Sequence, residues 1–244
     1  MGEDLKRHIV RIVLSLLLGL VFIGHATKEV EMPLLSTLDA FVYDARLRLT
    51  ATGGVNEQVV ILDIDERSLS EVGQWPWRRD KMAMLVNRLF DEYRISLLGF
   101  DVVFAEPDGH SGLESLETLA RGELRGDAAF QGALGRLRGQ LDHDRRFAEA
   151  LRGHANVLGY YFNNAGKAHR SGVLPAPAVA PEVFAGRPIA FTAWTGFGAN
   201  LPEFQNNAGH AGHFNPMVDF DGVSRRVPML VEHEGQYYES LSLA

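Results

Sequence analysis

Residues 59–104 read VVILDIDERSLSEVGQWPWRRDKMAMLVNRLFDEYRISLLGFDVVF, and the patterns within this stretch predict the fold class. Residues 59–62 are all apolar and mostly β-branched, which is typical of a strand covered on both faces. Residues 80–93 carry apolar side chains at helical spacing, and residues 96–104 form a second apolar run. Strand, helix and strand with a long crossover indicate a parallel βαβ unit, in which residues 59–62 are a central strand.

The C-terminal half adds a helix, a strand and then a different pattern. Residues 141–152 predict a helix with Asp142 as its N-cap, and residues 156–162 predict a third strand. Residues 163–202 are rich in Pro, Ala and Gly and indicate a surface excursion, whereas residues 218–236 favour antiparallel hairpins. The predicted fold is therefore α/β: a mixed sheet with a parallel βαβ core plus C-terminal antiparallel hairpins, preceded by one N-terminal transmembrane helix.

Two further stretches carry weaker signals. Residues 109–140 show no clean period and predict short helices in a surface insertion. Residues 239–244 predict the start of a helix with no cap or polar tail after it, so we expect this element to continue beyond residue 244.

Composition excludes several classes of protein. The 244 residues include 24 Lys and Arg against 31 Asp and Glu, with 46% hydrophobic and 23% charged residues, which are globular values. The acidic balance without a long basic block argues against a nucleic-acid partner, because binding polyphosphate requires clustered positive charge. The absence of cysteine excludes disulfide scaffolds, thiolate metal sites and cysteine nucleophiles.

The N-terminus is predicted to enter a membrane. Basic side chains, among them Lys6 and Arg11, precede the uncharged stretch of residues 12–23. Residues 9–26 are long enough for one spanning helix if Arg11 reaches the headgroups. A cleaved secretory signal is the alternative, because Gly24 and Ala26 provide the small residues of a cleavage site.

Both alternatives place the rest of the chain outside the cytoplasm, because the positive charges precede the apolar run. We therefore expect residues 1–8 to be a cytoplasmic tail, residues 9–26 a transmembrane helix, and residues 27–244 an extracytoplasmic domain. Residues 36–49 carry a helical apolar stripe and predict a helix that continues from the membrane into that domain.

Carboxylates follow the first two predicted strands. Ligands bind at the carboxyl edge of open α/β sheets, and oxygen ligands gathered there could hold a small ligand or a hard cation. The alternative is that these side chains cap helices and pair with arginines, Arg225 among them. The candidate ligand-binding carboxylates at this edge are Asp63, Asp65, Glu66, Asp101, Glu106 and Asp108. We predict neither a metal ion nor a cofactor in this segment.

The motif of Trp75, Pro76 and Trp77 lies between the first predicted strand and the helix. It could clamp an apolar or planar ligand, but a hydrophobic plug that seats the following helix is favoured. Together with Arg78 and Arg79, the two tryptophans complete the candidate ligand-binding set.

Two other motifs could bind metals. His210 and His213 lie three residues apart, but no third ligand is identifiable. The segment from Asp219 begins like a calcium loop, yet cations stand where further oxygens are needed. We predict a structural hairpin turn formed by Asp219, Asp221, Gly222 and Arg225. The common nucleophile, zinc-protease and phosphate-loop motifs do not occur in the sequence, which argues against an enzymatic role for this segment.

A series of motifs in fixed order resembles the CHASE domain of the second type, a cyclase/histidine-kinase-associated sensory extracellular family. The resemblance covers about residues 9–244. It rests on the basic tail and apolar helix, Tyr43-Asp44-x-Arg46-x-Arg48, VVILDIDERSLSEVGQWPWRRD, LLGFDVVFAEPD, LDHDRRFAEAL, the segment from Gly209 to Asn215, DFDGVSRRVPML and YYESLSLA.

The resemblance implies the N-terminal sensor of a bacterial receptor in the inner or cell membrane, with its domain in the periplasm or extracellular space. It implies a cytoplasmic output, most commonly a class III adenylate or guanylate cyclase, with histidine kinases, Ser/Thr kinases and diguanylate cyclases as alternatives. The expected partners are an unknown extracytoplasmic small ligand, the membrane and a second copy of the chain. An anchored metal-dependent hydrolase and a pure dimerisation module are the rival hypotheses.

Overall fold

The structure is a computed structural model that describes residues 2–27, 29–30, 32–165, 169–187 and 189–244. The chain divides into two compact units, Met1–Asp63 and Ile64–Ala244. Each unit is described by itself.

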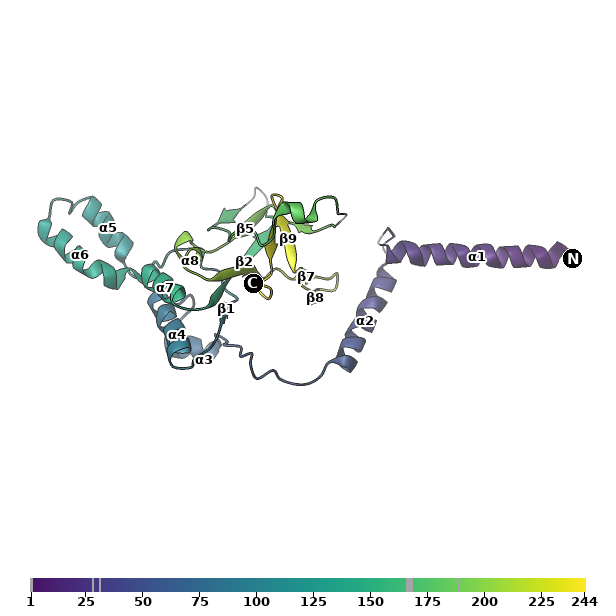
Figure 1. Ribbon diagram of the computed structural model, residues 1–244, viewed down its shortest axis with the longest axis horizontal. Helices are drawn as coiled ribbons and strands as arrows, with labels where there is room; N and C mark the ends of the chain where they lie inside the picture. The colour runs from purple at the N-terminus through teal and green to yellow at the C-terminus, as the bar shows by residue number, and fades with distance from the viewer. Residues whose placement is uncertain (1, 28, 31, 166–168, 188) are drawn as a thin grey trace. The chain divides into compact units, whose positions relative to one another are not determined.

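The first unit contains two helices followed by irregular chain (Figure 1). Helix α1 (Gly2–Ala26) includes Lys6–Ala26, a stretch that is long and apolar enough to cross a bilayer by length and composition. Helix α2 (Pro33–Thr50) begins with a proline at its N-terminus, where the missing N–H costs no hydrogen bond. Its bounds include the helix predicted at residues 36–49.

The prediction of a central strand at residues 59–62 is wrong. These residues lie in irregular chain, and the side chains of Val60 and Ile61 are 84% and 89% exposed. An apolar, β-branched run specifies a preference for burial, but a strand also needs a neighbour whose hydrogen-bond ladder it can join. The described residues provide no such neighbour for this run.

The second unit has mixed α/β structure. Its helices are α3 (Glu66–Val72), α4 (Arg79–Asp91), α5 (Leu113–Arg121), α6 (Ala128–Leu141), α7 (His143–Arg152), the 3-10 helix Pro181–Phe184 and α8 (Pro202–Gln205). Its strands are β1 (Leu98–Phe100), β2 (Asn156–Asn163), β3 (Arg170–Ser171), β4 (Thr192–Ala193), β5 (Gly196–Gly198), β6 (His210–His213), β7 (Met217–Val218), β8 (Ser224–Arg226), β9 (Leu230–His233) and β10 (Gln236–Glu239).

Strand β2 is the centre of the main sheet. It pairs in parallel with β1 and with β6, and it pairs antiparallel with β5, which in turn is parallel to β3. The parallel βαβ unit is therefore present, but it runs from β1 through α5, α6 and α7 to β2, one element later than predicted. Strands β7 and β8 form one antiparallel hairpin and β9 and β10 another, as predicted for residues 218–236.

Two helix predictions are confirmed. Helix α4 matches the helix predicted at residues 80–93, and α7 matches the one predicted at residues 141–152. The Asp142 side chain accepts a hydrogen bond from the Arg145 N–H at 3.1 Å, so it is the N-cap of α7. Helices α5 and α6 occupy the predicted insertion. The helix start predicted at residues 239–244 is wrong, because Glu239 ends strand β10 and pairs with Leu230.

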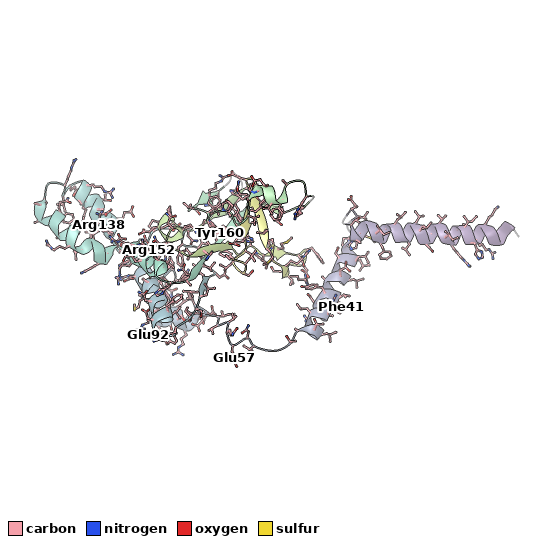
Figure 2. All side chains as sticks on the ribbon, viewed as in Figure 1. Phe41, Glu57, Glu92, Arg138, Arg152 and Tyr160 are labelled. Atoms are coloured by element: carbon pink, nitrogen blue, oxygen red, sulfur yellow. The ribbon has the colours of Figure 1, made fainter. Side chains whose placement is uncertain are left out.

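The core lies where α4 and α7 pack against the main sheet. Phe147 of α7 is fully buried, with its ring 4.9 Å from that of Phe104 and 5.1 Å from that of Phe204. Tyr160 of β2 is also fully buried, and Figure 2 labels it within the sheet. The candidate site lies beside this aromatic core, at the N-terminal ends of α4 and α7.

Candidate functional site

The side chain of Asp108 joins three segments that are far apart in sequence. It is only 2% exposed and lies in the loop that follows β1. Its Oδ2 accepts a hydrogen bond from the N–H of Arg79 at 2.8 Å, and its Oδ1 accepts one from the N–H of His110 at 2.9 Å. The Nδ1 atom of His143 lies 3.0 Å from Oδ2. We call Arg78, Arg79, Asp80, Asp108, His110, His143 and Asp144 the Asp108 cluster.

Helix starts explain why carboxylates gather here. The first N–H groups of a helix have no partner within it, and they attract negative charge. Arg79 is the first residue of α4, so Asp108 satisfies one of these free donors from outside the helix. Asp144, in the first turn of α7, accepts a hydrogen bond from the N–H of Asp108 at 2.9 Å.

Arg79 is the buried cation of the cluster. Its side chain donates to the carbonyl oxygens of Trp77 and Glu106, both at 3.3 Å, and its Nε lies 3.8 Å from Oδ1 of Asp144. Its guanidinium lies over the ring of Phe104, 4.8 Å from the centroid. Burial lowers the pKa of Arg79, while the charges of Asp144 and Asp108 oppose this shift.

The ring of His143 lies between Asp108 and Arg78. Its Nε2 lies 3.2 Å from Nη2 of Arg78, which also donates to Asp80 at 2.8 Å. Because an arginine can only donate, Nε2 must accept this hydrogen bond, and the ring proton lies on Nδ1, where it is donated to Asp108. His143 therefore connects the carboxylate of Asp108 to the guanidinium of Arg78.

The carboxylates of Asp108 and Asp144 have opposite pKa shifts. Burial would raise the pKa of Asp108, but hydrogen bonds from the N–H groups of Arg79 and His110 and from the rings of His143 and His110 lower it below its ordinary value. Burial raises the pKa of Asp144, although the hydrogen bond from the Asp108 N–H and the charge of Arg79 oppose it. The surroundings therefore favour the charged form of Asp108 and disfavour the charged form of Asp144.

The structure brings only some of the predicted site residues together. Arg78 and Arg79 belong to the cluster, and Glu106 contributes its backbone carbonyl while its side chain is exposed. Among the described residues, no hydrogen bond or ion pair joins the side chains of Glu66 or Asp101 to this cluster, and both are exposed.

Asp65 is the N-cap of α3. Its Oδ1 accepts from the N–H and the hydroxyl of Ser68 at 2.8 and 2.7 Å. Hydrogen bonds from that hydroxyl and that N–H lower the pKa of Asp65. Asp63 belongs to the other unit and is exposed there. Ligand binding by these carboxylates stays a prediction.

The two tryptophans lie at the start of α4. Their rings meet edge to face with centroids 5.9 Å apart, and both are partly buried against the core. The indole N–H of Trp77 donates to the carbonyl of Gly73 at 2.7 Å. This arrangement supports the hydrophobic plug, because the rings pack on the protein's own core.

Sequence reasoning missed Asp80, His110, His143 and Asp144. The last two lie in the motif LDHDRRFAEAL, whose helix start was recognised as a local signal. Their contacts with Asp108 depend on how α7 packs against α4, and no local pattern specifies that packing.

The remaining motifs do not form metal sites among the described residues, where no group of three or more His, Cys, Asp or Glu side chains could hold an ion. In the β7–β8 turn, Arg225 lies 3.1 Å from Asp219 and 2.7 Å from Asp221, and Gly222 has a φ of +81°. His213 is fully buried, and burial lowers its pKa to about 4.

The comparisons with known proteins identify the family. No curated protein and no solved structure matches the chain. The family model described as the CHASE2 domain matches residues 13–244, which is nearly the whole chain and includes residues of both units. This match agrees with the resemblance noted in the sequence motifs. The chain therefore belongs to the CHASE2 family, the sensory extracellular domains of signalling proteins.

Proposed function

We propose that this chain is the extracytoplasmic input domain of a membrane-anchored bacterial receptor that controls a cytoplasmic class III adenylate or guanylate cyclase. The observation that carries the proposal is the CHASE2 match over residues 13–244. The apolar stretch Lys6–Ala26 supports a single N-terminal anchor, and the preceding basic residues support a cytoplasmic tail.

In this proposal a small extracytoplasmic ligand acts by binding one arrangement of the domain more tightly than another. A ligand shifts such an equilibrium only by its differential affinity for the two states. The Asp108 cluster supports a role in such a change, because it ties the starts of α4 and α7 to the loop after β1. Helix α2 follows the anchor in sequence, so we propose that it carries the signal to the membrane.

The first experiment is to determine the reading frame beyond the codon for Ala244. We expect further apolar spans and then a nucleotide cyclase region. The protein from that frame, expressed in a cyclase-deficient bacterium, should raise cyclic AMP or cyclic GMP. A kinase or diguanylate cyclase region would keep the receptor but replace the output. A frame that ends within a few residues would overturn the receptor and favour an anchored enzyme or a dimerisation module.

The predicted ligand-binding carboxylates need a second experiment in the same protein. The double variant Asp63→Asn and Asp101→Asn should alter the output while tryptophan fluorescence shows that the domain stays folded. Both side chains are exposed, so their replacement leaves no buried group without a partner. An unchanged output in a correctly folded double variant would remove these two residues from the site.

A further inference from the structure

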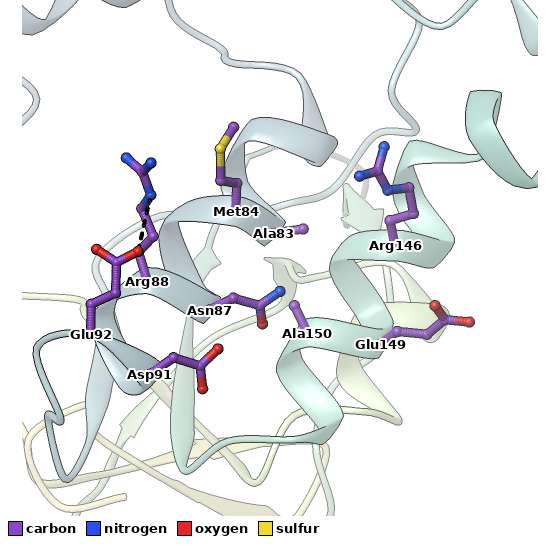
Figure 3. Close-up of a pocket in the computed structure, with 9 residues that line it drawn as sticks. All are labelled: Ala83, Met84, Asn87, Arg88, Asp91, Glu92, Arg146, Glu149 and Ala150. Carbon is purple, nitrogen blue, oxygen red and sulfur yellow. Dashed lines mark ion pairs between the residues drawn. The ribbon is translucent and has the colours of Figure 1, made fainter.

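An open groove runs along the outer face of the α4–α7 helix pair (Figure 3). It has a volume of about 570 Å³. Ala83 and Ala150 line it but are buried, at 5% and 6% exposed, whereas Met84 beside them is 53% exposed. We call this region, lined by α4 and α7 residues, the α4–α7 groove.

Most of the polar side chains in this groove have partners within the chain. Arg88 lies 3.6 Å from Glu92, and Glu149 lies 2.9 Å from Arg145 on its own helix. Asn87 lies 3.3 Å from the ring of His154. These groups line the groove without needing a ligand.

Asp91 and Arg146 differ from these residues. Both are exposed, and neither side chain makes a hydrogen bond or ion pair with any residue that the structure describes. Asp91 comes from α4 and Arg146 from α7, and Figure 3 shows them toward opposite ends of the groove. The groove therefore presents one unpaired negative charge and one unpaired positive charge.

Each of these charges also lies at the less favourable end of its helix. Asp91 is the last residue of α4, where the helix dipole is negative. Arg146 is the fourth residue of α7, close to the positive end of that dipole. Neither charge stabilises its own helix. A cation beside Asp91 and an anion beside Arg146, both supplied from outside the chain, would offset the unfavourable interaction of each side chain with its helix dipole.

We propose that the α4–α7 groove is the contact surface between two copies of this chain, related by a two-fold axis. A two-fold axis brings the same surface of both copies together. Asp91 of one copy then pairs with Arg146 of the other, and the same contact occurs twice. The exposed side chain of Met84 would supply the apolar part of the contact.

The charge pattern favours a second copy over another partner. A surface that carries one unpaired charge of each sign on opposite walls is complementary to itself after a two-fold rotation. Anchoring in one membrane would also raise the effective concentration of the copies for each other. This step rests on the proposed anchored receptor, but self-association is measured without any signalling output, so the two proposals can fail separately.

Charge exchange tests the proposal on the 244-residue chain in detergent micelles, by sedimentation velocity. We expect the unchanged chain to form dimers. Asp91→Arg and Arg146→Asp should each weaken the dimer about tenfold or more, because two attractive contacts become repulsive. The double variant Asp91→Arg/Arg146→Asp should return to within about threefold of the unchanged chain.

Two exposed residues outside the groove, Glu114 and Arg125, give matched controls. Glu114→Arg and Arg125→Asp make the same charge changes and should leave the dimer unchanged. A monomeric unchanged chain, single variants that dimerise normally, or a double variant that fails to recover would each overturn the proposal.

Cross-linking in native membranes locates the contact. The chain has no cysteine, so each introduced thiol is the only one present. A mixture of chains carrying Asp91→Cys and chains carrying Arg146→Cys should give a disulfide-linked heterodimer under mild oxidation. A Phe41→Cys chain monitors α2 as the rival contact. Phe41 cross-links without any Asp91–Arg146 product would overturn the groove interface.

Discussion

The Nδ1 atom of His143 lies 3.0 Å from Oδ2 of Asp108, and both side chains are almost fully buried. The same carboxylate oxygen accepts the first N–H of α4, at Arg79. One carboxylate therefore connects the starts of two helices to the loop after β1. Removing this carboxylate should therefore lower the stability of the whole second unit and not only that of the loop after β1.

Replacing Asp108 with Asn should lower the free energy of unfolding by about 2–4 kcal/mol. The amide removes a buried charge and leaves donors from Arg79, His110 and His143 with poorer acceptors. Urea unfolding followed by tryptophan fluorescence measures this, because all three tryptophans lie in the second unit.

The matched control is Asp101→Asn, the same chemical change at an exposed carboxylate. It should shift the unfolding free energy by less than about 0.5 kcal/mol. Equal effects of the two replacements would show that Asp108 does not connect the helices as described.

Replacing Arg79 with Met should destabilise the second unit by about 3 kcal/mol, because it leaves Asp144 partly buried without its cation. Adding Asp144→Asn to Arg79→Met should recover part of this loss, since the carboxylate charge is then also removed. A double-mutant cycle of unfolding free energies gives the coupling between the two side chains. Simple additivity would mean that the 3.8 Å contact between Arg79 and Asp144 contributes nothing.

Sequence patterns predicted those elements whose signals are local. Helix α7 has its N-cap at Asp142, and strand β2 has a continuous apolar run. The strand predicted at residues 59–62 was wrong, because an apolar run does not specify a partner strand. Likewise Arg78 and Arg79 were recognised in the loop before the helix predicted at residues 80–93, whereas His143 lies 65 residues from Arg78, so that contact depends on tertiary packing.

Asp65 provides a test that separates helix capping from ligand binding. Serine is also a good N-cap residue, whereas alanine is not. If capping is the role of Asp65, Asp65→Ser should keep the stability of α3 and Asp65→Ala should lose it, as measured by hydrogen exchange of the α3 amides. If Asp65 also binds a ligand, Asp65→Ser should keep α3 intact but lose the signalling response.

Stability should decrease with acid because of His213. Burial lowers its pKa to about 4 from an ordinary value of 6.5, so the folded state prefers the neutral ring and the unfolded state takes up the proton first. The contribution of His213 is therefore complete above pH 6.5 and is lost as the pH falls toward 4. The expected loss is about 3 kcal/mol, from urea unfolding at several pH values.

His213→Leu should remove most of this pH dependence. It should also raise stability at pH 7 by about 1 kcal/mol, because neither ring nitrogen of His213 has a hydrogen-bond partner among the described residues. His210→Leu changes an exposed histidine of the same strand and should leave the pH dependence as it is. If the free energy of unfolding of the His213→Leu variant still falls steeply in acid, other groups cause the pH dependence.

Gly159 should not tolerate a side chain, because β2 passes close to its neighbours there. A Cβ at Gly159 would lie 2.4 Å from the carbonyl oxygen of Phe100 and 2.8 Å from the ring of Phe214. Gly159→Ala should therefore lower the unfolding free energy by about 2 kcal/mol or more, since the parallel β1–β2 pair must shift. Gly135→Ala is the opposite control: a Cβ there meets nothing within 4 Å, so alanine in the interior of α6 should stabilise the chain by about 0.5–1 kcal/mol. Equal unfolding midpoints for the two variants would contradict the close packing of β1 against β2.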